Sequence, residues 1–172
     1  MEAAWMGKIF PLEPGQATWK FKTLAGITAT NLSSSERSAV LGRNGNLMTE
    51  IGGVDITEEG TMASGEFIDV IRGVDWIHAR IQERVFTLLV NTSKVPYTNA
   101  GITMVENEVR AVLSEATLNG ILSEDEPYTV TVPNVLDIAQ PDKATRCLPD
   151  VKFSGVLAGA IHKVKIQGVV TV

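Results

Sequence analysis

Cys147 and His162 are the side chains best suited to covalent chemistry in this sequence. A histidine beside a cysteine can take up the thiol proton and leave a nucleophilic thiolate. Nothing in the flanking sequence orients such a pair, and Cys147 stands near the core-like residues Leu148 and Val151, where an inert buried cysteine is the commoner state. A small hydrolase or ligand-binding domain that uses this region is therefore an alternative function and not the main one.

Metal and cofactor chemistry have little support. His78 and His162 are the two histidines, and with one cysteine they do not supply the several converging ligands that a zinc site needs. The sequence has no glycine-rich loop ending in Gly-Lys-Ser/Thr and no G-x-G-x-x-G after a predicted strand. The acidic runs TEEG and SEDEP lie in turn-like sequence that is typical of solvated charges. We expect no catalytic residue, no metal and no cofactor.

Length and charge exclude several classes of protein. The chain has 172 residues, which suits one domain with its own core. Its net charge of -5 and pI of about 5.1 argue against nucleic-acid binding. One cysteine permits no internal disulfide and fits folding in a reducing cytoplasm. Because no apolar run reaches about 18 residues and the N-terminus lacks signal-peptide features, no membrane segment is expected.

Two amphipathic helices dominate the predicted secondary structure. Residues 74–90 repeat apolar side chains at spacings of three and four, and residues 100–118 do the same before a stop at Asn119-Gly120. These apolar stripes predict a buried core that contains Ile77, Ile81, Val85, Leu88, Val105, Val109 and Leu113.

The other predicted elements are short. A serine among residues 33–35 can cap a helix that ends near Gly42, with Glu36 at its positive end. Strands are predicted for residues 19–22, for glycine-punctuated segments between 46 and 73, and for residues 127–133. Residues 140–150 read as a helical turn or loop, and residues 149–172 as a hairpin turning at Gly159. The predicted class is α+β, with a mixed or antiparallel sheet packed against two main helices and a C-terminal β-hairpin.

The last segment, HKVKIQGVVTV, alternates in the manner of a half-buried strand. His162, Val164, Ile166, Gly168, Val170 and Val172 share one face. A strand at the edge of a sheet exposes unpaired N–H and C=O groups. This segment therefore either pairs within its own sheet or receives a partner from outside the chain.

Four stretches resemble, in the same order, the tail sheath proteins of Mu-type and related contractile phages: PGQATWKFKTLAGI, GEFIDVIRGVDWIHARIQERVFTLL, KVPYTNAGI and RCLPDVKFSGVLAGAIHKVKIQGVVTV. The run from Phe67 to Arg72, followed by Lys94 to Thr98, is the most specific part. The resemblance implies one C-terminal sheath domain over residues 1–172, with residues 1–24 as an N-terminal extended segment. Sheath proteins of this family are longer, so the outer domain and the N-terminal arm of the parent protein are expected to be absent from this sequence.

The resemblance also implies a function without catalysis. The chain would be a structural subunit that polymerises with six-fold helical symmetry around the tail tube and contracts to drive the tube through the host envelope. Its partners would be neighbouring subunits and the tube protein, with no nucleic acid or membrane, in a virion assembled in the bacterial cytoplasm. A module that binds the tail tube or baseplate is the first alternative. The implied inter-subunit strand residues are Val164, Ile166, Val170 and Val172, and the tube-facing candidates are Lys143 and Arg146.

Overall fold

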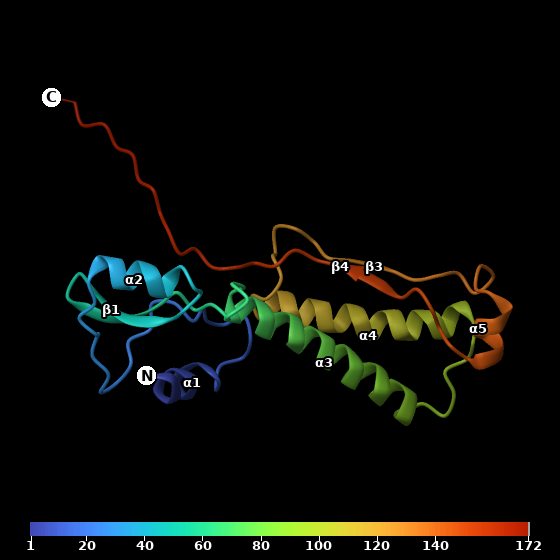
Figure 1. The fold of residues 1–172 in the computed structure, drawn as a ribbon. Helices are drawn as coiled ribbons and strands as arrows, with labels where there is room; N and C mark the ends of the chain where they lie inside the picture. Colours follow the sequence, from blue (N-terminus) through green and yellow to red (C-terminus); the bar gives the residue numbers. More distant parts are fainter. Residues whose placement is uncertain (172) are drawn as a thin grey trace.

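Two long helices form the larger of two lobes in the computed structural model, which describes residues 1–171 (Figure 1). Helix α3 spans Ile68–Asn91 and helix α4 spans Asn99–Leu118. The Thr98 hydroxyl accepts a hydrogen bond from the Gly101 N–H and caps α4. A Cβ atom at Gly101 would lie 1.9 Å from the Pro96 carbonyl oxygen, so only glycine allows α4 to begin so close to the preceding turn.

Helix α3 begins before the predicted start at residue 74. Residues 68–73 were expected to form part of a strand, but the helix begins at Ile68, directly after Phe67 at the N-cap position. The Ile68 N–H donates to the Gly60 carbonyl, and Asp69 places its charge at the positive end of the helix dipole. One of these contacts is made with a distant turn and the other by a single acidic residue. Strands were expected here from the turn signals, which do not indicate such contacts.

The core of the larger lobe follows the predicted stripes only in part. Ile77, Val109 and Leu113 are buried as predicted. Ile81, Val85, Leu88 and Val105 are only partly buried, which corrects the prediction for them. The reason is visible in Figure 1, where α3 and α4 converge at one end and diverge toward the other. The buried cluster is completed by Ala116, Ile121, Leu122 and Val130.

Two short antiparallel sheets confirm the α+β class. Strand β3 (Thr129–Thr131) pairs with β4 (Lys152–Ser154), with Val130 opposite Phe153, and β3 packs on α4. Helix α5 (Gln140–Thr145) lies between these strands in the sequence. The C-terminal strand thus has an antiparallel partner, but that partner is β3. The sequence predicted that the segment after Gly159 would be this partner. Within the described residues, that segment forms no strand.

The smaller lobe contains helices α1 (Glu2–Ile9) and α2 (Ser34–Leu41) and a sheet of β1 (Leu47–Ile51) and β2 (Val54–Glu58). The expectation of an extended segment over residues 1–24 is wrong at its beginning. Trp5 and Ile9, one helical turn apart, are both buried, and the Trp5 and Trp19 rings meet edge to face at 5.3 Å. Packing on Trp19 therefore favours a helix where the sequence shows only a short apolar pattern.

The predicted cap of α2 is confirmed. The Ser33 hydroxyl accepts from the Glu36 N–H, and the Glu36 carboxylate accepts from the Ser33 N–H. The strand expected at residues 19–22 is not formed, although Phe21 and Lys22 exchange backbone hydrogen bonds with Thr57 of β2. Phe21 has φ 61°, which interrupts the alternation, so that Trp19 and Lys20 are both buried.

A buried ion network joins the segments of the smaller lobe. Lys20 and Glu58 are 3% and 5% exposed, which makes pairing obligatory for both. The Lys20 Nζ lies 2.6 Å from Glu59 Oε1 and 3.7 Å from Glu58 Oε1, and the Arg37 guanidinium donates three hydrogen bonds to Glu58. Partial burial raises the pKa of Glu59, but the hydrogen bond and charge of Lys20 outweigh it and leave the pKa lowered.

The loss of stability on truncating a side chain to alanine depends on how deeply that side chain is buried. Leu113→Ala, at a fully buried site, should lower the free energy of unfolding by about 2–5 kcal/mol. Ile81→Ala should lower it by less, because Ile81 is only partly buried where α3 and α4 diverge. Leu118→Ala, at an 81% exposed site, should lower it by less than about 0.5 kcal/mol. Urea unfolding followed by circular dichroism measures all three. Equal losses for Ile81→Ala and Leu113→Ala would show that Ile81 is fully buried in solution and that α3 and α4 do not diverge there.

The lowered pKa of Glu59 predicts a pH dependence. Its stabilising contribution is complete above the unfolded pKa, near 4.5, and is lost as the pH falls through the lower folded pKa. The unfolding midpoint should therefore fall less steeply below about pH 5 in Glu59→Gln than in the unaltered chain. Glu126→Gln, at an exposed site, removes the same charge and should keep the steep slope. Parallel slopes for both variants would contradict this role for Glu59.

Candidate functional site

The residues considered for catalysis lie apart. Cys147 is exposed just after α5, and its backbone carbonyl accepts a hydrogen bond from the Tyr97 hydroxyl at 2.7 Å. His162 lies against the smaller lobe, where its ring contacts Phe21 and Phe67, and His78 is exposed on α3. The structure therefore does not assemble the Cys147–His162 pair that the hydrolase alternative requires. The expectation that Cys147 is buried is also wrong.

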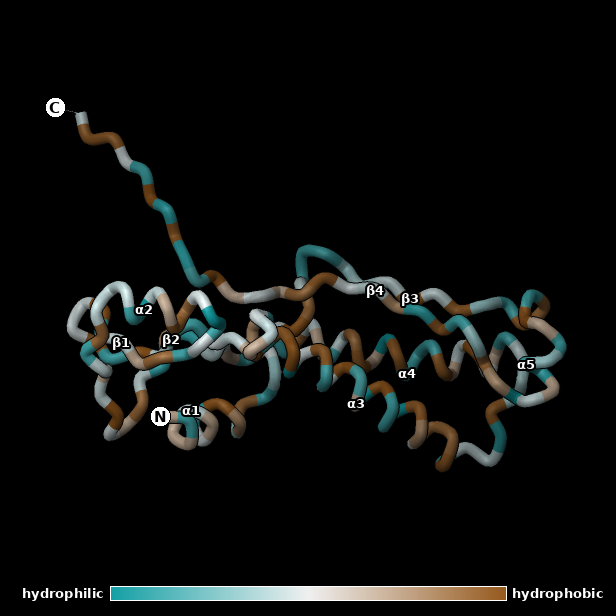
Figure 2. Tube along the Cα trace, in the orientation of Figure 1, coloured by the Kyte–Doolittle hydropathy of each residue, from teal (hydrophilic) through white to brown (hydrophobic). Residues whose placement is uncertain are grey.

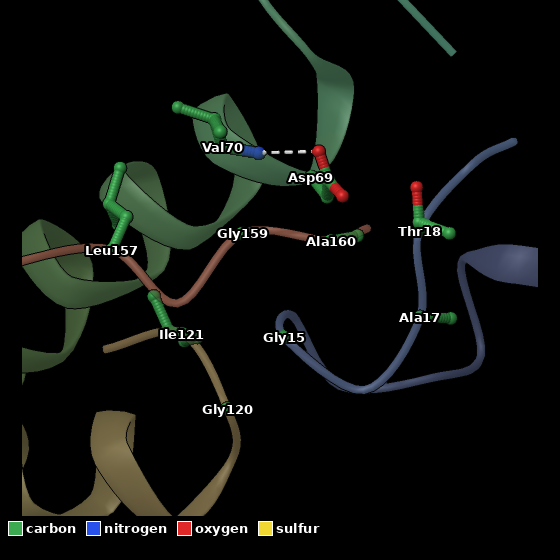
Figure 3. A pocket seen from close by; sticks show the side chains of 10 residues that line it. All are labelled: Gly15, Ala17, Thr18, Asp69, Val70, Gly120, Ile121, Leu157, Gly159 and Ala160. Atoms are coloured by element: carbon green, nitrogen blue, oxygen red, sulfur yellow. Dashed lines mark hydrogen bonds between the residues drawn. The ribbon is translucent and has the colours of Figure 1, made fainter. Parts of the chain in front are cut away.

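A small cavity lies where the two lobes meet (Figure 3). Its volume is about 50 Å³, and Gly15, Thr18, Asp69 and Gly159 are among the residues that line it. The Asp69 carboxylate accepts a hydrogen bond from the N–H of Val70, as the figure shows. The cavity is far smaller than the roughly 300–1,000 Å³ of a typical ligand pocket, so it does not support a substrate site.

No residues of the described part of the chain form a group of three or more His, Cys, Asp or Glu side chains able to hold a metal ion. Among residues 1–171, no helix is both long and apolar enough to span a membrane.

The terminal arm, defined as residues 163–171, is the most unusual surface of the molecule. It leaves the body as an extended chain with no neighbour on either side (Figures 1 and 2). Val164, Ile166 and Val170 are 73%, 88% and 96% exposed. The predicted strand residues thus lie on one free segment, except Val172, which is outside the described residues. A row of large aliphatic side chains at such exposure is a candidate surface for binding a partner.

An apolar groove lies between the diverging helices and the segment that leads into β4. Its volume is about 450 Å³. It is lined by Ile81, Val85 and Leu89 of α3, Ile102 and Val105 of α4, and Phe153 of β4. Three of them, Ile81, Val85 and Val105, are predicted core residues that the fold leaves partly covered. The period of the two helices revealed the apolar stripes, but their divergence is a tertiary property that no sequence signal indicated.

Tyr97 marks the rim of this groove. Desolvation, and then the negative charge of Asp142, raise the pKa of its phenol above the ordinary value. The phenol therefore remains neutral and keeps its donor for the Cys147 carbonyl. This bond joins the segment just before α4 to the chain that leaves α5, at the end of the groove that Tyr97 and Arg146 line.

β4 has a free edge beside the groove. Within residues 1–171 the sheet contains only β3 and β4, so the other side of β4 has no strand partner. All three β4 residues are exposed. A free strand edge next to an uncovered apolar groove is the arrangement that accepts an added strand.

Lys143 and Arg146 lie at the far end of the larger lobe, on α5 and directly after it. Arg146 is exposed and lines the groove, and Lys143 is half-buried. Their expected relation as neighbours on one helix is altered, because Arg146 has φ 58° and ends α5 as a left-handed cap. The two cations belong to one end of the molecule but not to one helix face.

A known structure shares this fold. The chain is similar to a chain in the "Cryo-EM structure of the anti-feeding prophage (AFP) baseplate, 6-fold symmetrised", with a TM-score of 0.67 and 14% identity. The similarity covers 98% of this chain and 48% of that one, so this chain spans about half the length of that protein. At this identity the similarity shows the fold alone. No curated protein sequence matches the chain significantly.

The sequence profile of a protein family matches residues 68–170, from the start of α3 to the second-last residue of the arm. The family is described as "E217 tail sheath protein gp31-like, C-terminal domain". The match covers more than half of the chain and includes the groove, β4, α5 and the arm. The chain therefore belongs to this tail sheath family, a family of structural proteins of contractile tails.

Proposed function

We propose that this chain is the C-terminal domain of a contractile tail sheath subunit. In the assembled tail, such subunits polymerise with six-fold helical symmetry around the tail tube, and their contraction drives the tube through the host envelope. The outer domain and the N-terminal arm belong to the rest of the parent protein. Assembly takes place in the cytoplasm of the bacterial host, and the product is part of the virion.

Two observations on the same chain carry this proposal: a free terminal arm and, in the larger lobe, an edge of β4 that has no strand partner within the described residues. In the proposed assembly, the arm of one subunit adds to the free edge of β4 in a neighbour. Main-chain hydrogen bonds supply affinity, and alternate side chains supply register. Val164, Ile166 and Val170 then enter the neighbour's apolar groove, where burial of each exposed aliphatic side chain contributes about 1.5–3 kcal/mol.

The basic end of the larger lobe is the proposed tube-facing surface. Arg146 is exposed at the tip that α5 forms, so it is accessible to a second macromolecule. A tube surface of negative potential would be recognised there by charge, which governs encounter and register more than affinity.

The first alternative is a module that binds the tail tube or the baseplate without forming a sheath. The solved structure with a similar fold is a baseplate, and for this reason we retain the baseplate module as an alternative. Electron microscopy of the complete protein with its tube separates the two: a sheath subunit forms long cylinders, and a baseplate module forms short rings or none.

A proline in the arm tests the strand addition. Val170→Pro removes one main-chain donor and fixes φ. A loss of about 1.4 kcal/mol per contact raises the critical concentration for cylinder formation about tenfold. Val170→Thr keeps the N–H and the β-branched shape and should assemble nearly normally. Sedimentation and negative-stain microscopy of the complete protein give the result, and normal cylinders from Val170→Pro would refute the strand role.

Charge reversal tests the tube-facing surface. Glutamate at both Lys143 and Arg146 should weaken co-assembly with the tube, and the difference from the unaltered protein should shrink as salt is raised. As a control, the single variant Arg146→Glu is compared with the single variant Arg43→Glu. Arg43 is exposed in the smaller lobe, and both substitutions change the charge by the same amount. Pelleting of sheath with tube at two salt concentrations measures the effect. Equal behaviour of this pair would place the docking surface elsewhere.

A further inference from the structure

His162 makes the last fixed contact of the chain before the arm. Its Nε2 lies 2.9 Å from the Thr18 hydroxyl oxygen, and its ring meets the Phe67 ring edge to face at 4.9 Å. The Phe21 ring lies 5.9 Å away on a similar perpendicular approach. Every other residue described after Leu157 is exposed, so His162 is the one anchored side chain of residues 158–171.

The three residues that hold His162 form a socket, and each of them is fixed in its turn. Phe21 is held by its N–H bond to the carbonyl of Thr57, a residue that is completely buried. Phe67 is the N-cap residue of α3, and Thr18 precedes the buried Trp19. The socket is therefore part of the folded body and does not depend on the arm.

The path into this socket crosses from one lobe to the other. The Ser123 N–H donates to the Val156 carbonyl, and the Ala158 N–H donates to the Ile121 carbonyl, so the chain is tied to the larger lobe as far as Ala158. Gly159 follows with φ 62° and with open space where a side chain would point. Without a second attachment, the chain would pivot at this glycine.

We propose that His162 is a positioning residue that clamps the root of the terminal arm to the smaller lobe. The clamp moves the pivot of the arm from Gly159 to the bond after His162 and sets the direction in which residues 163–171 leave the body. Its use in assembly rests on the proposed function, but the clamp itself is a property of the single chain.

The position of the pivot changes what the arm can reach. An extended chain spans about 30 Å over residues 163–171 and about 43 Å over residues 159–171. A shorter arm with a fixed root samples a smaller volume, so its effective concentration at a neighbour's strand edge is higher. The clamp also reduces the conformational entropy that the arm loses when it binds.

Backbone ¹⁵N relaxation of the 172-residue chain tests the clamp directly. In the unaltered chain, the order parameters of Ala160 and Ile161 should be about 0.8, and those from Val164 onward below about 0.6. In His162→Ala, the values at Ala160 and Ile161 should fall below about 0.6, because the pivot returns to Gly159. His162→Phe keeps the ring contacts and should largely restore them, and Thr18→Val should have an intermediate effect.

Ile161→Ala is the matched control, because Ile161 is 83% exposed and adjacent to His162. It should leave the pivot in place. Unchanged amide shifts in the smaller lobe show that each variant is folded. The clamp is refuted if Ala160 and Ile161 are already as mobile as the arm in the unaltered chain, or if they remain rigid in His162→Ala.

Assembly of the complete protein tests the positioning role separately. His162→Ala should raise the critical concentration for cylinders about twofold to tenfold, and His162→Phe less. If relaxation shows the clamp but Val170→Pro assembles normally, the clamp stands and the strand role fails. If Val170→Pro blocks assembly while His162→Ala assembles at the unaltered concentration, the positioning role is wrong.

Discussion

The close approach of several backbone segments around Ile121 is the constraint on which the rest of the structure depends. A Cβ atom at Gly15 would lie 2.3 Å from the Asn119 carbonyl oxygen, and one at Gly73 would lie 2.8 Å from the Ile121 side chain. Glycine at both positions allows the smaller lobe and α3 to close on the turn after α4. The Ile121 carbonyl also accepts the Ala158 N–H, so the chain that leads to the arm is fixed at the same junction. Arg72 adds a polar tie by donating to the Leu12 carbonyl.

Several facing side chains of α3 and α4 are less completely packed where the two helices diverge. Val112 and Leu113 are fully buried near the convergent end of the helices, whereas Phe86 and Val90, toward the end of α3, are 68% and 63% exposed. Single exposed apolar side chains are common on protein surfaces, whereas neighbouring ones mark candidate binding surfaces. Exposed apolar side chains in the groove, at the end of α3 and along the arm are candidate binding surfaces, and others, such as Leu118 and Leu136 at 81% and 82% exposure, lie outside these regions.

The family match and the fold similarity cover different parts of the chain. The family profile covers residues 68–170, which contain the larger lobe and the arm, and the fold similarity extends over the smaller lobe as well. The arm begins at the boundary between these parts, because β4 brings it from the larger lobe and His162 attaches it to the smaller one. The direction of the arm therefore depends on both lobes and on the junction between them.

Local interactions made part of this structure predictable from the sequence. The Ser33–Glu36 capping box, the Thr98 cap and the apolar stripes of α3 and α4 depend on residues within a few positions of one another, and the family resemblance depends on ordered motifs. Three features depended on residues that are far apart in the chain: the helical form of residues 2–9, the pairing of β4 with β3, and the divergence of α3 and α4. The contact between Thr18 and His162 joins positions 144 residues apart, and no periodicity or spacing could indicate it. Short-range hydrogen bonds and side-chain periods are encoded locally, whereas the partner of a strand edge and the socket of a side chain are decided by which distant surfaces meet when the chain folds.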